Sequence, residues 1–174
     1  MTARNVLSIL LACVLVLAVT VAPAAAEPVE RPFRAVFSGD VVFTPGAEFG
    51  LPPNPAPPFI YTVSLASGTS RHLGLTTMFS YHPTPTGETI SGGHMTLTAA
   101  NGDEVYFEYS GSAPLPVIGV PSTVHVVCTY TITGGTGRFD GATGSGTGDA
   151  YVEFPGELLP LWTGTWEWVG TIAY

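Results

Sequence analysis

Residues 122–148, STVHVVCTYTITGGTGRFDGATGSGTG, combine the two patterns from which this fold can be predicted. In the first half, apolar residues from Val124 to Ile132 take every second position and oppose a row of threonines with His125. A period of two is typical of a β-strand with one buried and one solvated face. The glycine-rich second half predicts a turn and a further strand, because glycine permits positive φ angles and close backbone approach.

The glycine-rich half also makes a local prediction about side chains. We expect Gly134, Gly135 and Gly137 to form a tight turn that ends the strand at 122–133. Phe139 should then turn inward and plug the end of the molecule, while Arg138 and Asp140 face solvent or pair with the turn backbone. The next strand should begin within 141–148, where Gly141 and Gly144 belong to the same structural motif.

Alternation with a period of two recurs through most of the chain after residue 32. Further apolar rows are expected to face inward in segments 33–43, 59–65, 94–99, 103–110 and 161–174. Asn101-Gly102 separates two of these segments and predicts a type I′ hairpin that buries Leu97 and Phe107. Seven to eight short antiparallel strands fit a sandwich or a barrel. We favour an all-β fold with about eight antiparallel strands in a closed barrel, because closure leaves no exposed strand edge.

The glycine-rich segment does not match the common phosphate- or calcium-binding motifs. A P-loop requires a lysine, and the chain contains none. The dinucleotide-binding GxGxxG spacing is missed by one residue, and no helical pattern follows to supply a dipole. A calcium-binding repeat requires tandem copies, whereas this motif occurs once.

Three segments together resemble a known family. YTITGGTGRFDGATG at 130–144 is similar to the signature of the allene oxide cyclase and dirigent proteins. GTSRHLGLTTMF at 68–79 and MTLTAANGDEVYFEYSG at 95–111 resemble strands of exported bacterial proteins with an allene oxide cyclase-like barrel domain. The resemblance implies an eight-stranded antiparallel barrel of calycin type that uses no cofactor. The catalytic residues of the cyclases have no match here, so no catalytic residue can be assigned.

Charge and composition limit the possible partners. The 174 residues suit one domain, and 5 Lys+Arg against 13 Asp+Glu give a net charge of −8. Such a chain is a poor partner for nucleic acid or for an anionic membrane surface. Arg4, the apolar run at 6–21 and Ala24-Ala25-Ala26 predict a signal peptide at 1–26, cleaved after Ala26. An uncleaved anchor is the alternative. Cleavage would leave a secreted or extracytoplasmic single barrel domain at 27–174 without a membrane anchor.

Catalytic and metal-binding motifs are not found in the sequence. The four histidines, His72, His82, His94 and His125, form neither HxH nor HExxH, and we predict no metal site and no cofactor. Cys128, the only cysteine after residue 26, lies on the apolar face of its strand and is expected to be a buried, inert thiol.

Two interpretations of the barrel interior remain open. The inward aromatic residues either fill it completely or line a cavity for one small ligand. The candidate lining residues are Phe37, Tyr61, Phe79, Phe107, Tyr109, Tyr130, Trp166 and Trp168.

Three functions are compatible with this reading. The first hypothesis is an exported barrel that binds a small apolar molecule or serves an envelope or extracellular interaction. The second is a cofactor-independent cyclase or a dirigent-like stereochemical guide that acts by positioning its substrate in an apolar pocket. The third is a structural module that forms a homo-oligomer.

Overall fold

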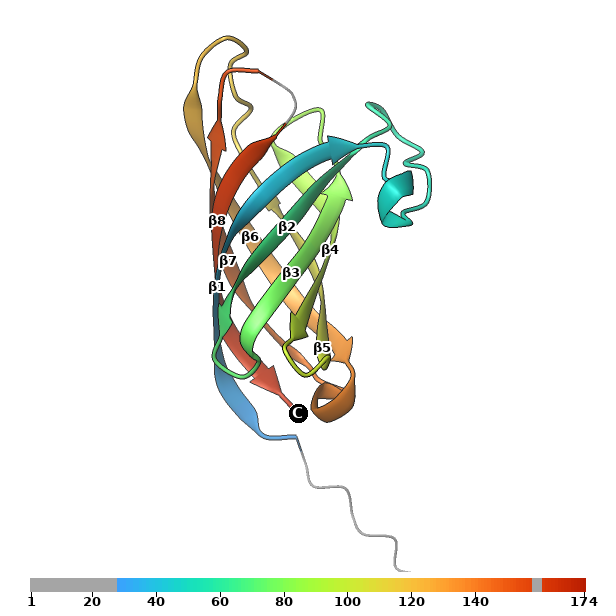
Figure 1. Cartoon of the computed structure of the whole chain (residues 1–174), viewed down its shortest axis with the longest axis vertical. Coiled ribbons are helices and arrows are strands. Elements are labelled where there is room, and N and C mark those ends of the chain that lie inside the picture. The colour runs from blue at the N-terminus through green and yellow to red at the C-terminus, as the bar shows by residue number, and fades with distance from the viewer. Residues whose placement is uncertain (1–27, 158–160) are drawn as a thin grey trace, which may run out of the picture.

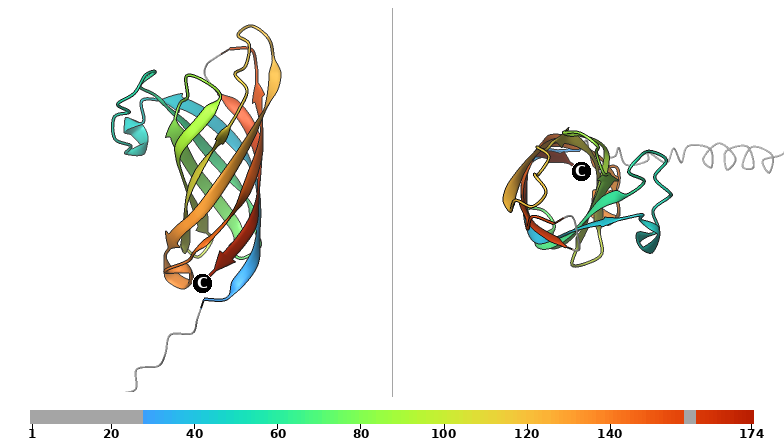
Figure 2. Two further views of the ribbon diagram at one scale, coloured as in Figure 1. Left: turned by 180° about the vertical axis from the view of Figure 1, so that it is seen from behind. Right: turned by 90° about the horizontal axis from the view of Figure 1, so that it is seen from above.

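The chain forms a closed barrel of eight antiparallel strands in which each strand pairs with the next and β8 pairs with β1 (Figures 1 and 2). The structure is a computed structural model that describes residues 28–157 and 161–174. The predicted signal peptide at 1–26 therefore lies outside the described residues. The predicted fold class is confirmed. The strands are β1 (Glu30–Thr44), β2 (Tyr61–Ser70), β3 (Gly74–Pro83), β4 (Thr89–Ala99), β5 (Glu104–Ser112), β6 (Ser122–Gly135), β7 (Gly144–Phe154) and β8 (Trp162–Ala173).

The two ends of the barrel differ in their connections. At one end, which we name the closed end, short turns at 71–73 and 100–103 and the loop at 136–143 lie beside the C-terminus. At the other, the open end, lie the loops at 45–60, 84–88 and 113–121 and the described residues 155–157 that follow β7 (Figure 1). No helix among residues 28–157 and 161–174 is long and apolar enough to cross a membrane.

The β4–β5 hairpin has the predicted register. Leu97 and Phe107 are buried, and Glu108 is exposed. The turn itself differs from the type I′ prediction, because Gly102 has a φ of 87° and Asn101 is not among the positive-φ residues. The Gly102 amide donates to the Ala99 carbonyl, which makes a three-residue loop that ends in a left-handed glycine.

The predicted facing of β2, and that of Phe79 in β3, is wrong. Val41, an inward residue of β1, pairs with Ser64, so the inward row of β2 is polar or small, whereas Tyr61 and Leu65 point outward. Phe79 pairs with Leu65 and also lies on the outer face. Tyr61 stays buried because the long loop at 45–60 covers the outer surface here, and Phe49 of this loop packs 6.0 Å from Phe79 between ring centroids.

The closed end is sealed as the glycine motif predicts. Phe139 is fully buried, in a 3-10 turn (Gly137–Phe139), and packs edge-on against Tyr174 at 4.8 Å. Arg138 and Asp140 are exposed, and Arg138 donates to the carbonyl of His72. The strand β6 runs two residues further than predicted, to Gly135, before the turn.

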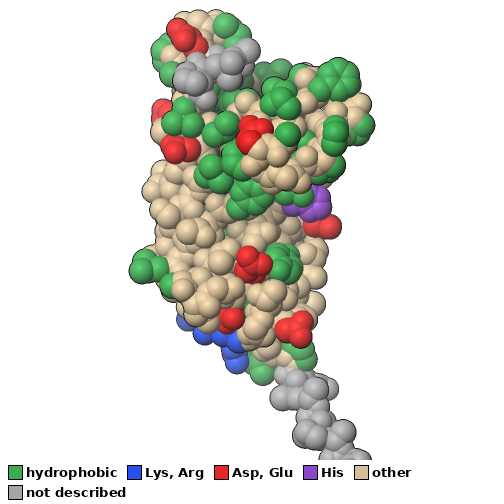
Figure 3. All heavy atoms as spheres, turned by 45° about the vertical axis from the view of Figure 1, so that its right-hand side comes forward, with side chains coloured by type: hydrophobic (Ala, Val, Ile, Leu, Met, Phe, Trp, Pro, Cys, Tyr) green, Lys and Arg blue, Asp and Glu red, His purple; other side chains and the backbone are tan. Residues whose placement is uncertain are grey.

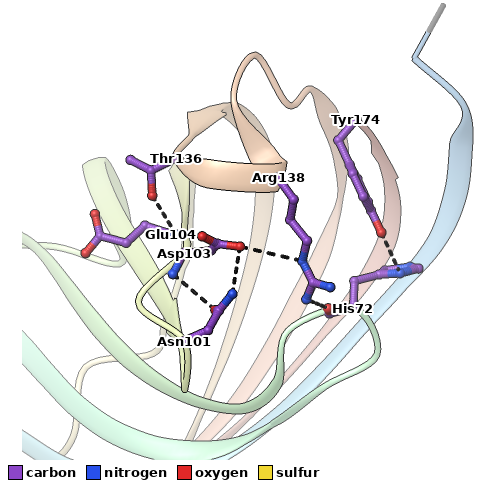
Figure 4. A network of polar contacts seen from close by, with 7 residues as sticks. All are labelled: His72, Asn101, Asp103, Glu104, Thr136, Arg138 and Tyr174. Atoms are coloured by element: carbon purple, nitrogen blue, oxygen red, sulfur yellow. Dashed lines mark hydrogen bonds and ion pairs between the residues drawn. The ribbon is translucent and has the colours of Figure 1, made fainter. Parts of the chain in front are cut away.

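A polar network joins three connections of the closed end (Figure 4). Thr136 accepts from the Glu104 amide at 2.9 Å, which ties the β6–β7 loop to the β4–β5 hairpin. Arg138 lies 3.9 Å from a carboxylate oxygen of Asp103 and also reaches the β2–β3 turn at His72. The loops therefore hold one another in place around Phe139.

Candidate functional site

The open half of the barrel contains an apolar cavity of about 220 Å³. Its floor and walls come from inward residues of the strands, and its mouth from the loops at 84–88 and 113–121. All three tryptophans of the chain line it: Trp162, Trp166 and Trp168. Further lining residues are Val41, Phe43, Thr62, Ser64, Ser80, His82, Tyr109, Val124, Val126, Cys128, Ala150 and Val152.

Below the cavity the barrel is filled. Phe33 and Phe107 pack with ring centroids 5.8 Å apart, and Phe107 lies 5.4 Å from Tyr130. Trp168 packs on Tyr130 at 5.7 Å, and this layer separates the cavity from the closed end. The two interpretations of the interior therefore each describe one half of the barrel.

The predicted lining residues fall into three groups. Tyr109, Trp166 and Trp168 line the cavity. Phe37, Phe107 and Tyr130 are buried in the hydrophobic core but are not among the lining residues. Tyr61 and Phe79 lie on the outer face, because the register of β1 with β2 and of β2 with β3 turns them away from the interior.

Glycines on neighbouring strands allow the large rings to lie against the barrel wall. A Cβ atom at Gly148 would lie 2.3 Å from Cε3 of Trp168, and one at Gly93 would lie 2.5 Å from Cε2 of Tyr109. Each ring thus occupies the space that a neighbouring side chain would otherwise fill. The cavity keeps its volume because these aromatic residues lie along its wall and floor.

A hydrogen-bonded pair belongs to the polar part of the cavity lining, which also contains Thr62, Ser64, Ser80, Thr84 and Asp149. His82 Nδ1 of β3 lies 2.9 Å from the Tyr109 hydroxyl of β5. Burial raises the pKa of Tyr109 far above its ordinary value, and the neighbouring Ser80 hydroxyl opposes this shift. Burial also lowers the pKa of His82 to about 4. Both side chains are therefore uncharged near pH 7.

Cys128 also lines the cavity, next to this pair. Burial raises the pKa of its thiol to about 11, so the thiolate needed for nucleophilic attack is scarce at neutral pH. No group of three or more metal-ligating side chains occurs in the described part of the chain.

The sequence prediction missed Ser64, Ser80 and His82 as lining residues. Ser64 and Ser80 alternate with Val63, Leu65, Phe79 and Tyr81, large side chains that lie on the outer face, so the alternation indicated the opposite face. The one available signal was the long proline-rich stretch at 45–60, whose length is unusual for a hairpin connection. A loop of that length can cover an outer face and reverse the usual pattern.

Charge is distributed unequally between the ends. The four arginines of the described residues, Arg31, Arg34, Arg71 and Arg138, lie toward the closed end, and Figure 3 shows basic side chains gathered there. The loops of the open end carry Glu48, Glu88 and Glu157 in their described residues, together with exposed apolar side chains of the 113–121 loop. The cavity therefore opens beside acidic and apolar groups.

The fold and the cavity place the molecule in the class of closed eight-stranded antiparallel barrels with an internal apolar site. Comparisons with models of protein families, with curated proteins and with solved structures find no match to this chain.

The half-buried His82 predicts a pH-dependent stability. Between the folded pKa of about 4 and the ordinary value near 6.5, the unfolded chain binds a proton that the folded chain does not. The free energy of unfolding should therefore fall by about 2 kcal/mol as the pH drops from 7 to 5 through this group. Tyr109, which bonds His82, and Cys128, which lines the same cavity, have raised pKa values and do not titrate in this window.

Urea denaturation at both pH values measures this dependence. His82→Phe should remove about 2 kcal/mol of the difference between pH 7 and pH 5, whereas His94→Phe on the exposed face of β4 should retain it. An equal pH dependence in wild type and His82→Phe would show that His82 is readily protonated in the folded protein.

Proposed function

We propose that this protein binds a small apolar molecule in the cavity of the open half of the barrel. The observation that carries the proposal is an apolar space of about 220 Å³ that opens between the 84–88 and 113–121 loops. An apolar protein cavity of about 150 Å³ is sufficient to bind benzene. A substituted ring or a short branched chain therefore fits the space.

The walls of the cavity favour binding for two reasons. Aromatic and aliphatic side chains surround the space, and each Å² of apolar surface that a ligand buries contributes about 25 cal/mol. The large rings are also held by neighbouring residues, as Trp168 is by Tyr109 and Tyr130 at 5.8 and 5.7 Å. Because the site is already formed, rearrangement on ligand entry costs little free energy.

The proposal also covers the family to which the protein is related and the place where it acts. A closed eight-stranded barrel, with the glycine motif in the β6–β7 connection, supports distant kinship with the allene oxide cyclase and dirigent proteins. The pattern of residues 1–26 supports export. An exported protein of this kind would meet its ligand outside the cytoplasmic membrane.

The neutral fluorescent probe 1-aminoanthracene tests the proposal. All three tryptophans line the cavity, so a bound probe should quench their emission by energy transfer and fluoresce more strongly itself. Val126→Phe places a large ring in the cavity and should weaken probe binding at least about 10-fold, a difference of about 1.4 kcal/mol. Val127→Phe, on the outer face of the same strand, should bind the probe as wild type does.

Equal binding by both variants would place the probe on the exposed apolar surface and contradict the proposal. If Val126→Phe binds the probe more weakly, as expected, mass spectrometry of molecules that co-purify with the wild-type protein and are lost from Val126→Phe identifies the natural ligand.

A further inference from the structure

We propose that the ligand is a neutral molecule that carries a hydrogen-bond acceptor, such as a ketone, aldehyde or ester carbonyl, which takes the Nε2–H of His82. This inference rests on the proposed function and assigns the chemical class of the ligand. It follows from the positions of three side chains, from the protons they carry, and from the charges around the mouth.

Two of the side chains form a hydrogen bond from one wall of the cavity to another, and the third lies beside them. Ser80 and His82 are inward residues of β3, and Tyr109 is an inward residue of β5. The Tyr109 hydroxyl oxygen lies 2.9 Å from Nδ1 of His82. The rings of His82 and Tyr109 meet edge-on with centroids 5.9 Å apart, which fixes the direction of the imidazole.

The protons of this pair follow from the chemistry of its two groups. Burial keeps Tyr109 protonated, and a phenol hydroxyl is a stronger donor than imidazole while a neutral imidazole nitrogen is the stronger acceptor, so Tyr109 donates to His82 Nδ1. Neutral imidazole has one donor and one acceptor nitrogen, and Nδ1 is then the acceptor. The ring proton therefore resides on Nε2, an atom that makes no hydrogen bond to another described residue. His82 thus offers a donor to a molecule in the cavity.

The charges argue against an anionic ligand. Neither lysine nor arginine lines the cavity. The described residues of the open-end loops include Glu48, Glu88 and Glu157, while the described arginines lie toward the opposite end. The only charged residue of the lining is Asp149, which would repel an anion. A carboxylate would also lose its water without a cation to replace it, which is costly in an apolar site. A neutral carbonyl avoids both costs.

Three molecules of similar shape distinguish the possibilities. Acetophenone presents a carbonyl, α-methylstyrene replaces the carbonyl oxygen by a CH₂ group, and benzoate presents a carboxylate. Their affinities can be measured at pH 7 from the indole N–H signals of the three tryptophans in ¹H–¹⁵N spectra. We expect acetophenone to bind about 3–10-fold more tightly than α-methylstyrene, and benzoate to bind at least about 10-fold more weakly than acetophenone.

Variants assign the preference to the hydrogen-bonded pair of His82 and Tyr109. His82→Phe should bind acetophenone and α-methylstyrene equally, and Tyr109→Phe should reduce the preference for acetophenone. His94→Phe, on the exposed face of β4, should keep the wild-type preference. Long-range ¹H–¹⁵N spectra of wild-type His82 give a readout that does not depend on any variant, and they should show the Nε2–H form.

The outcomes separate this inference from the proposed function. Equal wild-type affinity for acetophenone and α-methylstyrene, with both weakened by Val126→Phe, would overturn the inference and leave the binding function standing. Tightest binding of benzoate, or an Nδ1–H form of His82, would also overturn the inference. No binding of any of the three at millimolar concentration, together with equal probe binding by the Val126 and Val127 variants, would overturn both.

Discussion

Phe139→Ala is expected to lower the free energy of unfolding by about 3–5 kcal/mol, as in other fully buried aromatic residues. Phe139 has no exposed surface, and its ring contacts Tyr174 at 4.8 Å between centroids. Alanine would leave a void beneath the network that joins Thr136, Arg138 and Asp103, and the loops around it can close the void only by breaking these contacts. Denaturation in urea, followed by tryptophan emission, measures the change.

The matched control is Phe59→Ala, because Phe59 is 59% exposed in an open-end loop. Its removal should change the free energy of unfolding by no more than about 0.5 kcal/mol. Phe139→Leu should fall between the two, since it keeps most of the apolar volume. A wild-type denaturation midpoint for Phe139→Ala would mean that the closed end is not sealed by this ring.

Gly135→Val is expected to destabilise the protein by about 3 kcal/mol, the upper part of the range for overpacked positions. A Cβ atom at Gly135 would lie 2.4 Å from the carbonyl oxygen of Glu104 and 2.7 Å from that of Phe139. Both obstacles are backbone atoms of neighbouring segments and cannot rotate away. Gly135 is not among the positive-φ residues, so crowding and not dihedral strain makes glycine necessary here.

Gly87→Val is the control for this substitution. Gly87 has a φ outside the positive region, and a Cβ atom there would meet nothing within 4 Å. Its denaturation midpoint should stay near that of wild type, whereas Gly135→Val should shift strongly in the same experiment. Similar midpoints for the two variants would show that the β6–β7 connection moves aside at little cost.

The strand pattern could be predicted because alternation is a local property of the chain. Leu97 and Phe107 are buried as the period of two requires, and β6 buries Val124, Cys128, Tyr130 and Ile132 as predicted. Barrel closure also followed from sequence, since many short antiparallel strands without helices must either close or leave edges exposed. Phe139 could be placed because a bulky residue among glycines has few other positions available.

The facing of β2 and β3 could not be predicted, because alternation identifies two faces without saying which of them is covered. In most antiparallel barrels the apolar row is the inner one. Here the loop at 45–60 covers part of the outer surface, so Tyr61 and Phe79 are outside while Ser64 and Ser80 face the cavity. That assignment depends on a contact between segments distant in sequence.

The candidate site likewise depends on distances that no local pattern contains. His82 and Tyr109 are 27 residues apart and sit on strands that are not neighbours in the sheet, yet closure of the barrel brings their polar atoms to 2.9 Å. The volume of the cavity depends on rings from one strand lying over glycines of the next, as Trp168 lies over Gly148. The amino-acid sequence by itself was therefore sufficient to predict the strands and the burial of Phe139 at the closed end. Three-dimensional packing assigned the inner faces, left half of the interior open and brought His82 and Tyr109 together, because each of these depends on side chains from several strands at once.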